Sequence, residues 1–142
     1  MKKSTVLILL IVVLASAMQF GAVFADDSLL QIGVLQLVEH SALDAAYAGF
    51  VDGLKEAGYE DGVNIQIDFQ NAQADQANLM TISDRFVKNK VDLILAIATP
   101  AAQAVASATS EIPIIVTAVT DLVGARLIES NELPGTNVSG TT

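Results

Sequence analysis

The sequence predicts an α/β protein with a doubly wound, open parallel β-sheet and helices on both faces. Two observations lead to this class. Short aliphatic runs, typical of strands, alternate along the chain with longer segments whose apolar residues recur at helical spacing. Connections that contain a helix join parallel strands through right-handed crossovers. The predicted order is β-α-β-α-β-α-β, followed by one further short strand.

The first strand and the first helix are predicted over residues 31–38 and 41–58. Ser41 is placed to cap the helix, and Asp44 follows in the first turn, where an acidic side chain suits the helix dipole. Gly58 is placed to end the helix. Apolar side chains recur on one face at helical spacing and predict its buried side. They are Leu43, Tyr47, Phe50 and Leu54.

A second strand is predicted over residues 63–69, where apolar and polar residues alternate as in a strand with one more exposed face. A polar loop then leads to Asp75, a typical N-cap residue. The buried stripe of the second helix follows, and basic residues near its end suit the helix dipole. The stripe is Leu79, Ile82 and Phe86, and the basic residues are Arg85, Lys88 and Lys90.

The second half of the chain is more apolar. Residues 91–98 form a nearly continuous apolar run, as expected of a strand covered on both faces. A third helix is predicted over residues 100–109 and another buried strand over residues 112–119. A tail rich in turn residues leads to a short strand at residues 137–140.

The first 25 residues have the features of a secretory signal peptide. Lys2 and Lys3 precede an apolar core, and Ala25 ends a segment with residues that suit a signal peptidase. The alternative is an uncleaved membrane anchor, but the apolar core alone is too short to span a bilayer. We therefore expect cleavage after Ala25, one domain over residues 26–142, and no stable membrane anchor. Because the chain has no cysteine, a lipid anchor on that residue is excluded, and the expected location is the periplasm.

Composition excludes several classes of function. The formal charge is −9, and removal of Lys2 and Lys3 with the signal would make it −11, so the surface repels nucleic acid. The sequence lacks the glycine-rich loops that bind dinucleotides or phosphates, and it lacks a serine nucleophile motif. No group of His, Asp and Glu has metal-ligand spacing. We therefore expect no cofactor, no metal and no catalytic residue.

Ligands of open parallel sheets bind beyond the carboxyl ends of the strands. Three such ends carry chemistry in this sequence: one after the first strand, one before the third helix, and one after the fourth strand. The candidate ligand-binding residues are Leu37, Glu39, His40, Ser41, Thr99, Pro100, Ala101, Ala102, Thr120 and Asp121.

The Thr-Pro junction predicts an anion site. Thr99 is a plausible N-cap and Pro100 a favoured first helical residue. Free backbone N–H groups at the helix start, together with the dipole, suit a carboxylate. The groups expected to be free are those of Ala101, Ala102 and Gln103. In the alternative interpretation Thr-Pro only starts a helix, and the alanines only allow close packing on the sheet.

The charged candidates have two interpretations each. Glu39 and His40 can contact a polar ligand, but a single histidine without a nucleophile is more often solvated or capping. Asp121 can pair with a ligand ammonium group, or it can cap the turn that follows it.

Three segments carry a resemblance to a known family. They are IGVLQLVEHSALDAAYAGFVDGLKEAGYEDGVNIQIDFQNAQADQANL, DLILAIATPAAQA and IPIIVTAVTDLVGA. In this order they resemble the N-terminal lobe of ABC-transporter substrate-binding proteins, nearest to the TrpX-like group associated with aromatic amino acid uptake. The resemblance covers residues 31–142.

This resemblance implies a type I periplasmic-binding-protein fold, in which two α/β lobes joined by hinge strands hold the ligand between them. It implies a non-catalytic protein that binds an amino acid, such as tryptophan or phenylalanine, and delivers it to an ABC permease. The implied contacts come from residues 37–41, residues 99–102, Thr120 and Asp121. Ser41 and Leu122 stand where relatives usually have proline, and both changes loosen a loop.

Relatives continue into a second lobe, so the chain is expected to be a fragment. A single lobe lacks the opposing contacts, so we expect weak amino acid binding and a tendency to self-associate. Two other functions remain open. One is a small exported enzyme on a flavodoxin-like sheet, with Asp121 or His40 as general base. The other is the effector domain of a repressor, which the signal-like N-terminus disfavours.

Overall fold

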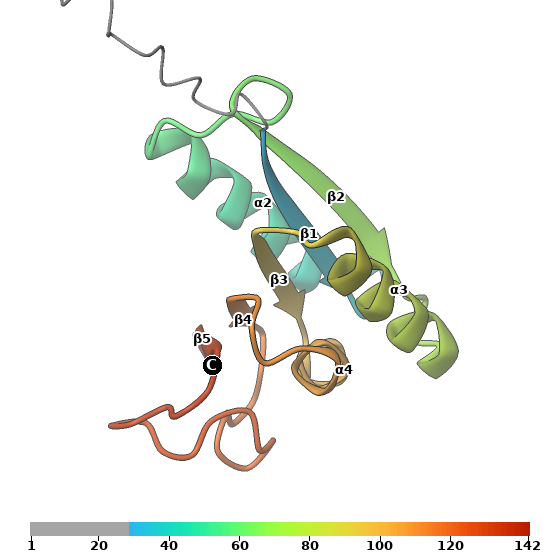
Figure 1. Ribbon diagram of the computed structural model, residues 1–142, viewed down its shortest axis with the longest axis vertical. Helices are drawn as coiled ribbons and strands as arrows, with labels where there is room; N and C mark the ends of the chain where they lie inside the picture. Colours follow the sequence, from blue (N-terminus) through green and yellow to red (C-terminus); the bar gives the residue numbers. More distant parts are fainter. Residues whose placement is uncertain (1–28) are drawn as a thin grey trace, which may run out of the picture.

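The computed structural model describes residues 29–142, and the predicted signal peptide at residues 1–25 lies outside them. Five strands form one parallel sheet in the order β2-β1-β3-β4-β5, which confirms the predicted fold class (Figure 1). The strands are β1 Leu30–Gln36, β2 Ile65–Asn71, β3 Leu93–Ile97, β4 Ile114–Thr117 and β5 Val138–Gly140. The helices are α2 Ser41–Glu56, α3 Gln76–Asn89 and α4 Thr99–Ala108.

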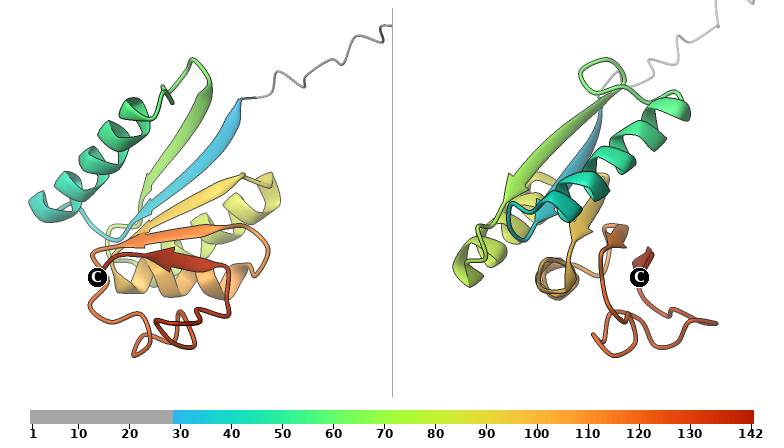
Figure 2. Two further views of the ribbon diagram at one scale, coloured as in Figure 1. Left: turned by 90° about the vertical axis from the view of Figure 1, so that its left-hand side faces the viewer. Right: turned by 180° about the vertical axis from the view of Figure 1, so that it is seen from behind.

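Helices cover both faces of the sheet, as a doubly wound fold requires. Helix α2 packs on one face, and α3 and α4 lie side by side on the other (Figure 2). Strand β3 lies at the centre of the sheet and is almost fully buried along its length, as its apolar sequence predicts.

The core beneath α3 and α4 depends on one close approach. Phe86 of α3 is fully buried, and its ring lies directly over Gly33 of β1. A Cβ atom at Gly33 would lie 2.8 Å from the ring atom Cδ2, so any side chain there would displace the ring. Leu79 is also buried and Ile82 partly buried, which confirms the predicted stripe of this helix.

The opposite face is covered more lightly. The predicted stripe of α2 packs against the sheet, but no α2 side chain is fully buried. Tyr47 meets Phe69 of β2 with ring centroids 4.6 Å apart and an interplanar angle of 39°. Burial of the phenol raises the pKa of Tyr47, and the nearby charge of Asp61 raises it further.

Of the predicted ends of α2 and α3, two are confirmed and one is corrected. Asp75 caps α3 by accepting from the Asn78 N–H at 2.9 Å. Gly58 follows the end of α2 at φ +89°, a left-handed geometry that glycine adopts without strain. The N-cap of α2 is His40 rather than Ser41, which becomes the first helical residue.

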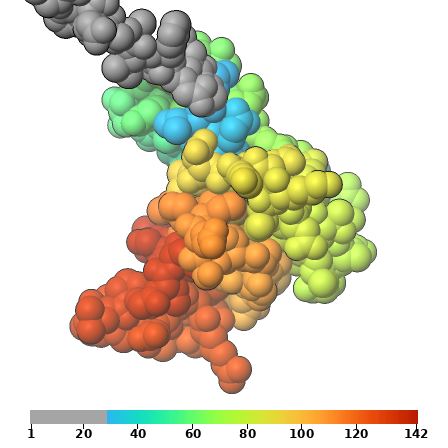
Figure 3. Space-filling view, in the orientation of Figure 1, coloured from blue at the N-terminus to red at the C-terminus, as the bar shows by residue number. Residues whose placement is uncertain are grey.

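The segment between β4 and β5 returns without a helix to the opposite end of the sheet. Leu122, Leu127 and Ile128 anchor it to the core that α3 and α4 cover. In the space-filling view this segment projects beyond α4 (Figure 3). Among residues 29–142, no helix combines the length and the apolar character needed to cross a membrane.

Candidate functional site

The sheet brings together the three strand ends that the sequence singles out. Strands β1, β3 and β4 are neighbours and run in the same direction, so their carboxyl ends share one edge. Backbone hydrogen bonds extend this arrangement beyond the strands. The Leu37 N–H donates to the Ile97 carbonyl at 3.3 Å, and the Ala98 N–H donates to the Thr117 carbonyl at 3.0 Å. The loops that follow are therefore fixed next to one another at their bases.

The junction between β3 and α4 differs from the prediction by one residue. The N-cap is Ala98, Thr99 is the first helical residue, and Pro100 is the second. Ala98 makes no side-chain cap and has φ 85° and ψ 152°, a conformation that residues with a side chain rarely adopt. The helix therefore begins one residue earlier than predicted, and no threonine side chain caps it.

The set of free amides at this helix start is correspondingly smaller than predicted. The Ala102 N–H donates to the Ala98 carbonyl at 3.0 Å, so it already belongs to the helical pattern. Thr99 and Ala101 carry the N–H groups that precede the first intrahelical bond, and Pro100 has none. The side chains of Ala101 and Ala102 are fully buried in the core. The two alanines therefore do pack closely on the sheet, as the alternative interpretation predicts. A ligand at this helix start would contact backbone atoms and not the alanine methyl groups.

The segment after β1, up to the first residue of α2, holds four candidates in different environments. Leu37 is partly buried against the core, whereas Glu39, His40 and Ser41 are exposed. His40 Nδ1 accepts a hydrogen bond from the Ala42 N–H at 3.2 Å, which places the proton of the neutral ring on Nε2. The histidine therefore caps the helix, as one of its two interpretations predicts. Its Nε2 takes no part in that hydrogen bond.

Gln36, the last residue of β1, is a polar group that the sequence analysis did not single out. Its side chain is 1 % exposed. Its Nε2 donates to the Val38 carbonyl at 3.0 Å and to Asp44 Oδ1 at 2.7 Å. Its Oε1 is buried without a hydrogen-bond partner among the described residues. The sequence does show a polar residue at the end of an apolar strand. Such a residue is equally expected where a strand end is exposed to solvent, so the pattern alone does not predict that Gln36 is buried.

The third strand end confirms the turn-capping interpretation of Asp121. Its Oδ1 accepts from the Gly124 N–H at 2.9 Å, and its backbone carbonyl accepts from the Ala125 N–H at 2.9 Å. Both Thr120 and Asp121 are exposed at the carboxyl edge. Asp121 therefore shapes the turn, and its remaining oxygen Oδ2 is the atom left for an ammonium group.

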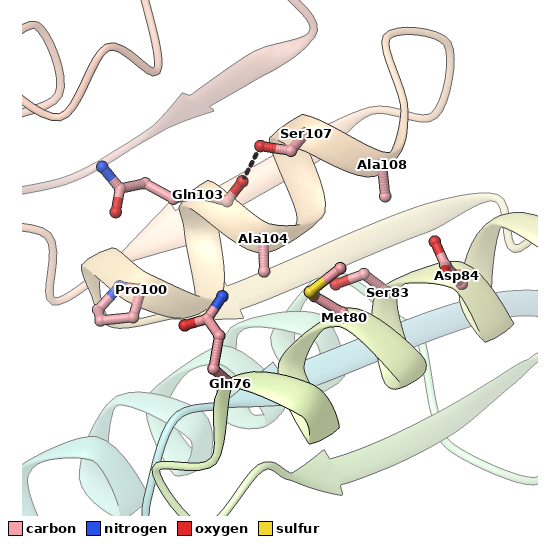
Figure 4. A pocket seen from close by; sticks show the side chains of 9 residues that line it. All are labelled: Gln76, Met80, Ser83, Asp84, Pro100, Gln103, Ala104, Ser107 and Ala108. Carbon is pink, nitrogen blue, oxygen red and sulfur yellow. Dashed lines mark hydrogen bonds between the residues drawn. The ribbon is translucent and has the colours of Figure 1, made fainter.

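A separate groove of about 320 Å³ runs between α3 and α4 (Figure 4). It meets the candidate site only at Pro100. Its lining residues are Gln76, Met80, Ser83, Asp84, Pro100, Gln103, Ala104, Ser107 and Ala108. Within residues 29–142, no three His, Asp or Glu side chains are grouped so that they could hold a metal ion.

Comparison with known proteins identifies the family. A family model described as ABC transporter substrate binding protein matches residues 31–142. The chain belongs to this family. Substrate-binding proteins bind solutes and are not enzymes, so the family membership removes the support for an exported enzyme or a repressor domain.

Named relatives agree with this assignment. A tyrosine-binding protein of Clostridioides difficile (strain R20291) is 58% identical over 111 residues, which are 78% of this chain and 32% of that protein. A ligand-free, open substrate-binding protein with adhesive properties from Clostridium difficile has 54% identity and a TM-score of 0.79, with 80% of this chain and 39% of the other covered. A Streptococcus pneumoniae ABC domain in complex with L-Trp has 48% identity and a TM-score of 0.77, with 80% and 38% covered. The chain thus spans about a third of the curated relative's length.

Proposed function

We propose that this chain supplies one half of an amino acid site in the solute-binding component of an ABC uptake transporter, and that the ligand has an aromatic side chain. The observation that carries the proposal is the 48% identical relative in complex with L-Trp. The tyrosine-binding relative supports the same ligand class. The candidate residues at the carboxyl edge are the surface on which we place the ligand.

The chemistry of the edge suits the two ends of an amino acid. The N–H groups of Thr99 and Ala101 lie at the positive end of the α4 dipole and offer donors to a carboxylate. Asp121 and Glu39 are exposed acids on the neighbouring loops and suit the ammonium group. Ligand and permease contacts from a second lobe would complete the site, and closure of that lobe would present the ligand to the permease.

Export is a further part of the proposal, and the family assignment supports it. We infer that residues 1–25 direct the chain out of the cytoplasm and are cleaved after Ala25, which places the protein in the periplasm or at the cell surface. Mass spectrometry of the exported protein tests this inference, and a mature N-terminus at Asp26 is the expected result. An intact Met1 on the exported protein would contradict it.

Amide NMR during ligand titration tests the proposed site because it detects weak binding as well as tight binding. L-tryptophan and L-tyrosine are added to the chain, with L-lysine as the control. The expected shifts gather at residues 37–41, residues 99–102, Thr120 and Asp121. Shifts confined to the α3–α4 groove, or no difference from lysine, would contradict the proposal.

Two analogues separate the ends of the ligand. Tryptamine lacks the carboxylate and is expected to lose the shifts at Thr99 and Ala101 while keeping those near Asp121. Indole-3-propionate lacks the ammonium group and is expected to show the reverse pattern. Identical maps for both analogues would exclude the proposed orientation.

A further inference from the structure

Gln36 connects two structural elements through one buried amide group. It ends β1, and its Nε2 reaches the Val38 carbonyl in the following loop and the Asp44 carboxylate in the first turn of α2. The bond to Asp44, at 2.7 Å, joins a donor to a charged acceptor, which is the stronger kind of hydrogen bond. The loop of residues 37–40, here called the β1–α2 loop, contains the first contact, and the second contact lies in the helix that follows it.

The burial of this amide is difficult to explain by stability alone. Gln36 is 1 % exposed, and Oε1 has no hydrogen-bond partner among the described residues. An unsatisfied buried acceptor is destabilising, whereas an apolar side chain of similar size has no such group. Its neighbours on the same face of β1, Ile32 and Val34, are apolar and belong to the core. A leucine at position 36 would continue that pattern.

We propose that Gln36 is a positioning residue of the ligand site, which holds the β1–α2 loop and the start of α2 in the geometry that binds the amino acid. This inference rests on the proposed function, because the loop carries Glu39 and His40. Gln36 itself is buried, so its proposed effect on the ligand acts through the loop. Its two hydrogen bonds fix where the strand ends, where the helix begins, and therefore where the exposed loop side chains lie.

Two independent readouts test the proposal with Gln36→Leu. Hydrogen exchange of the unliganded chain measures order at residues 38–44. We expect exchange there to accelerate at least about tenfold, since both hydrogen bonds of the amide are lost, one of them charge-assisted, while the urea midpoint stays close to that of the wild type. Titration with L-tryptophan is expected to show affinity weakened by about tenfold. A purely structural role would instead lower the urea midpoint and affinity together.

Asp44→Ala removes the carboxylate that accepts the hydrogen bond from Gln36, so the two single variants and the double variant form a double-mutant cycle. Asp44→Ala is expected to reproduce the exchange and affinity changes, and the double variant Gln36→Leu/Asp44→Ala to add little to either single change. Asp52→Ala is the matched control, because it removes an exposed acid of the same helix that makes no bond to Gln36. Gln36→Met serves as the second variant if Gln36→Leu does not fold.

The outcomes separate this inference from the function on which it rests. Unchanged exchange at residues 38–44 in Gln36→Leu overturns the positioning role, whatever the ligand result. Faster exchange with unchanged tryptophan affinity overturns the link to the site. If the wild type shows no response to any aromatic amino acid, the proposed function fails, and hydrogen exchange alone decides whether Gln36 fixes the loop.

Discussion

Ala98 has the backbone geometry of a glycine at the point where β3 meets α4. Its φ of 85° and ψ of 152° lie in a region that costs side-chain-bearing residues on the order of 1–3 kcal/mol. Its backbone groups are both engaged, because the N–H bonds to Thr117 and the carbonyl accepts from Ala102. These bonds hold the strained residue in place at the base of the candidate anion site.

Ala98→Gly is expected to raise the free energy of unfolding by about 1 kcal/mol. Relief of strain outweighs the added flexibility of glycine in the unfolded chain, which costs about 0.5–1 kcal/mol. Urea unfolding measures the change. Ala48→Gly, at an exposed position inside α2, is the control and is expected to lower stability by about 1 kcal/mol. Equal losses in both variants would show that Ala98 is not strained.

At the scale of the element, the start of α2 depends on the side chain of His40. The imidazole Nδ1 satisfies the Ala42 N–H, and the His40 carbonyl accepts from the N–H groups of Leu43 and Asp44. Histidine is an unusual N-cap, because Nδ1 must carry no proton in order to accept the hydrogen bond from the Ala42 N–H. Cap and candidate ligand contact are therefore combined in one residue.

His40→Ala is expected to lower the free energy of unfolding by about 1 kcal/mol, because the Ala42 N–H loses its acceptor. His40→Asn supplies a good N-cap and is expected to match or exceed the stability of the wild type. Thermal unfolding followed by circular dichroism measures both variants. If asparagine destabilises the chain as much as alanine does, the cap contributes nothing and the ring acts through other contacts.

The helix starts also show which parts of an element could be predicted from the sequence. The stripe on α2 and the cap at Asp75 depend on local spacing and side-chain chemistry, and both are confirmed. The caps predicted at Ser41 and Thr99 are wrong by one residue. The preference of N-cap positions for serine and threonine is a local property of the sequence. The first helical turn also depends on the direction in which the chain leaves the preceding strand, and this direction cannot be predicted from the cap residue.

At the scale of the whole molecule, unbalanced charge dominates the surface. The chain has 16 acidic and 7 basic residues. Within residues 29–142 one salt bridge is present, Arg85 to Asp68 at 2.7 Å, and both partners are partly exposed. Such pairs contribute about 0–1 kcal/mol, so repulsion among the remaining acids outweighs them.

Added salt is therefore expected to stabilise the protein. Raising NaCl from about 10 mM to about 150 mM shortens the screening length from about 30 Å to about 8 Å and weakens the repulsion. The urea midpoint is expected to rise, and Asp52→Asn, which removes one exposed acid, is expected to show a smaller rise. A midpoint that falls with salt would mean that attractive pairs dominate instead.

Fold and site differ in how far the sequence determines them. The order of elements along the chain and the buried helix faces follow from the period of the apolar residues, and the structure agrees with them. The predicted binding residues share one edge of the sheet, but their roles as ligand contacts stay predictions. Gln36 was missed because its hydrogen bond to Asp44, eight residues later, forms only when the loop folds the start of α2 back onto the end of β1.

Strand β1 lies inside the sheet, between β2 and β3, and both of its partners come later in the chain. Its first partner, β2, follows a whole helix later, and the Gln31 N–H meets the Asp92 carboxylate across 61 residues. Such pairings slow folding, because newly synthesised β1 stays without a partner until residues 65–71 and then 93–97 have been made. Until then the aliphatic side chains of β1 have no partner strand to cover them, which makes the unfinished chain prone to aggregation.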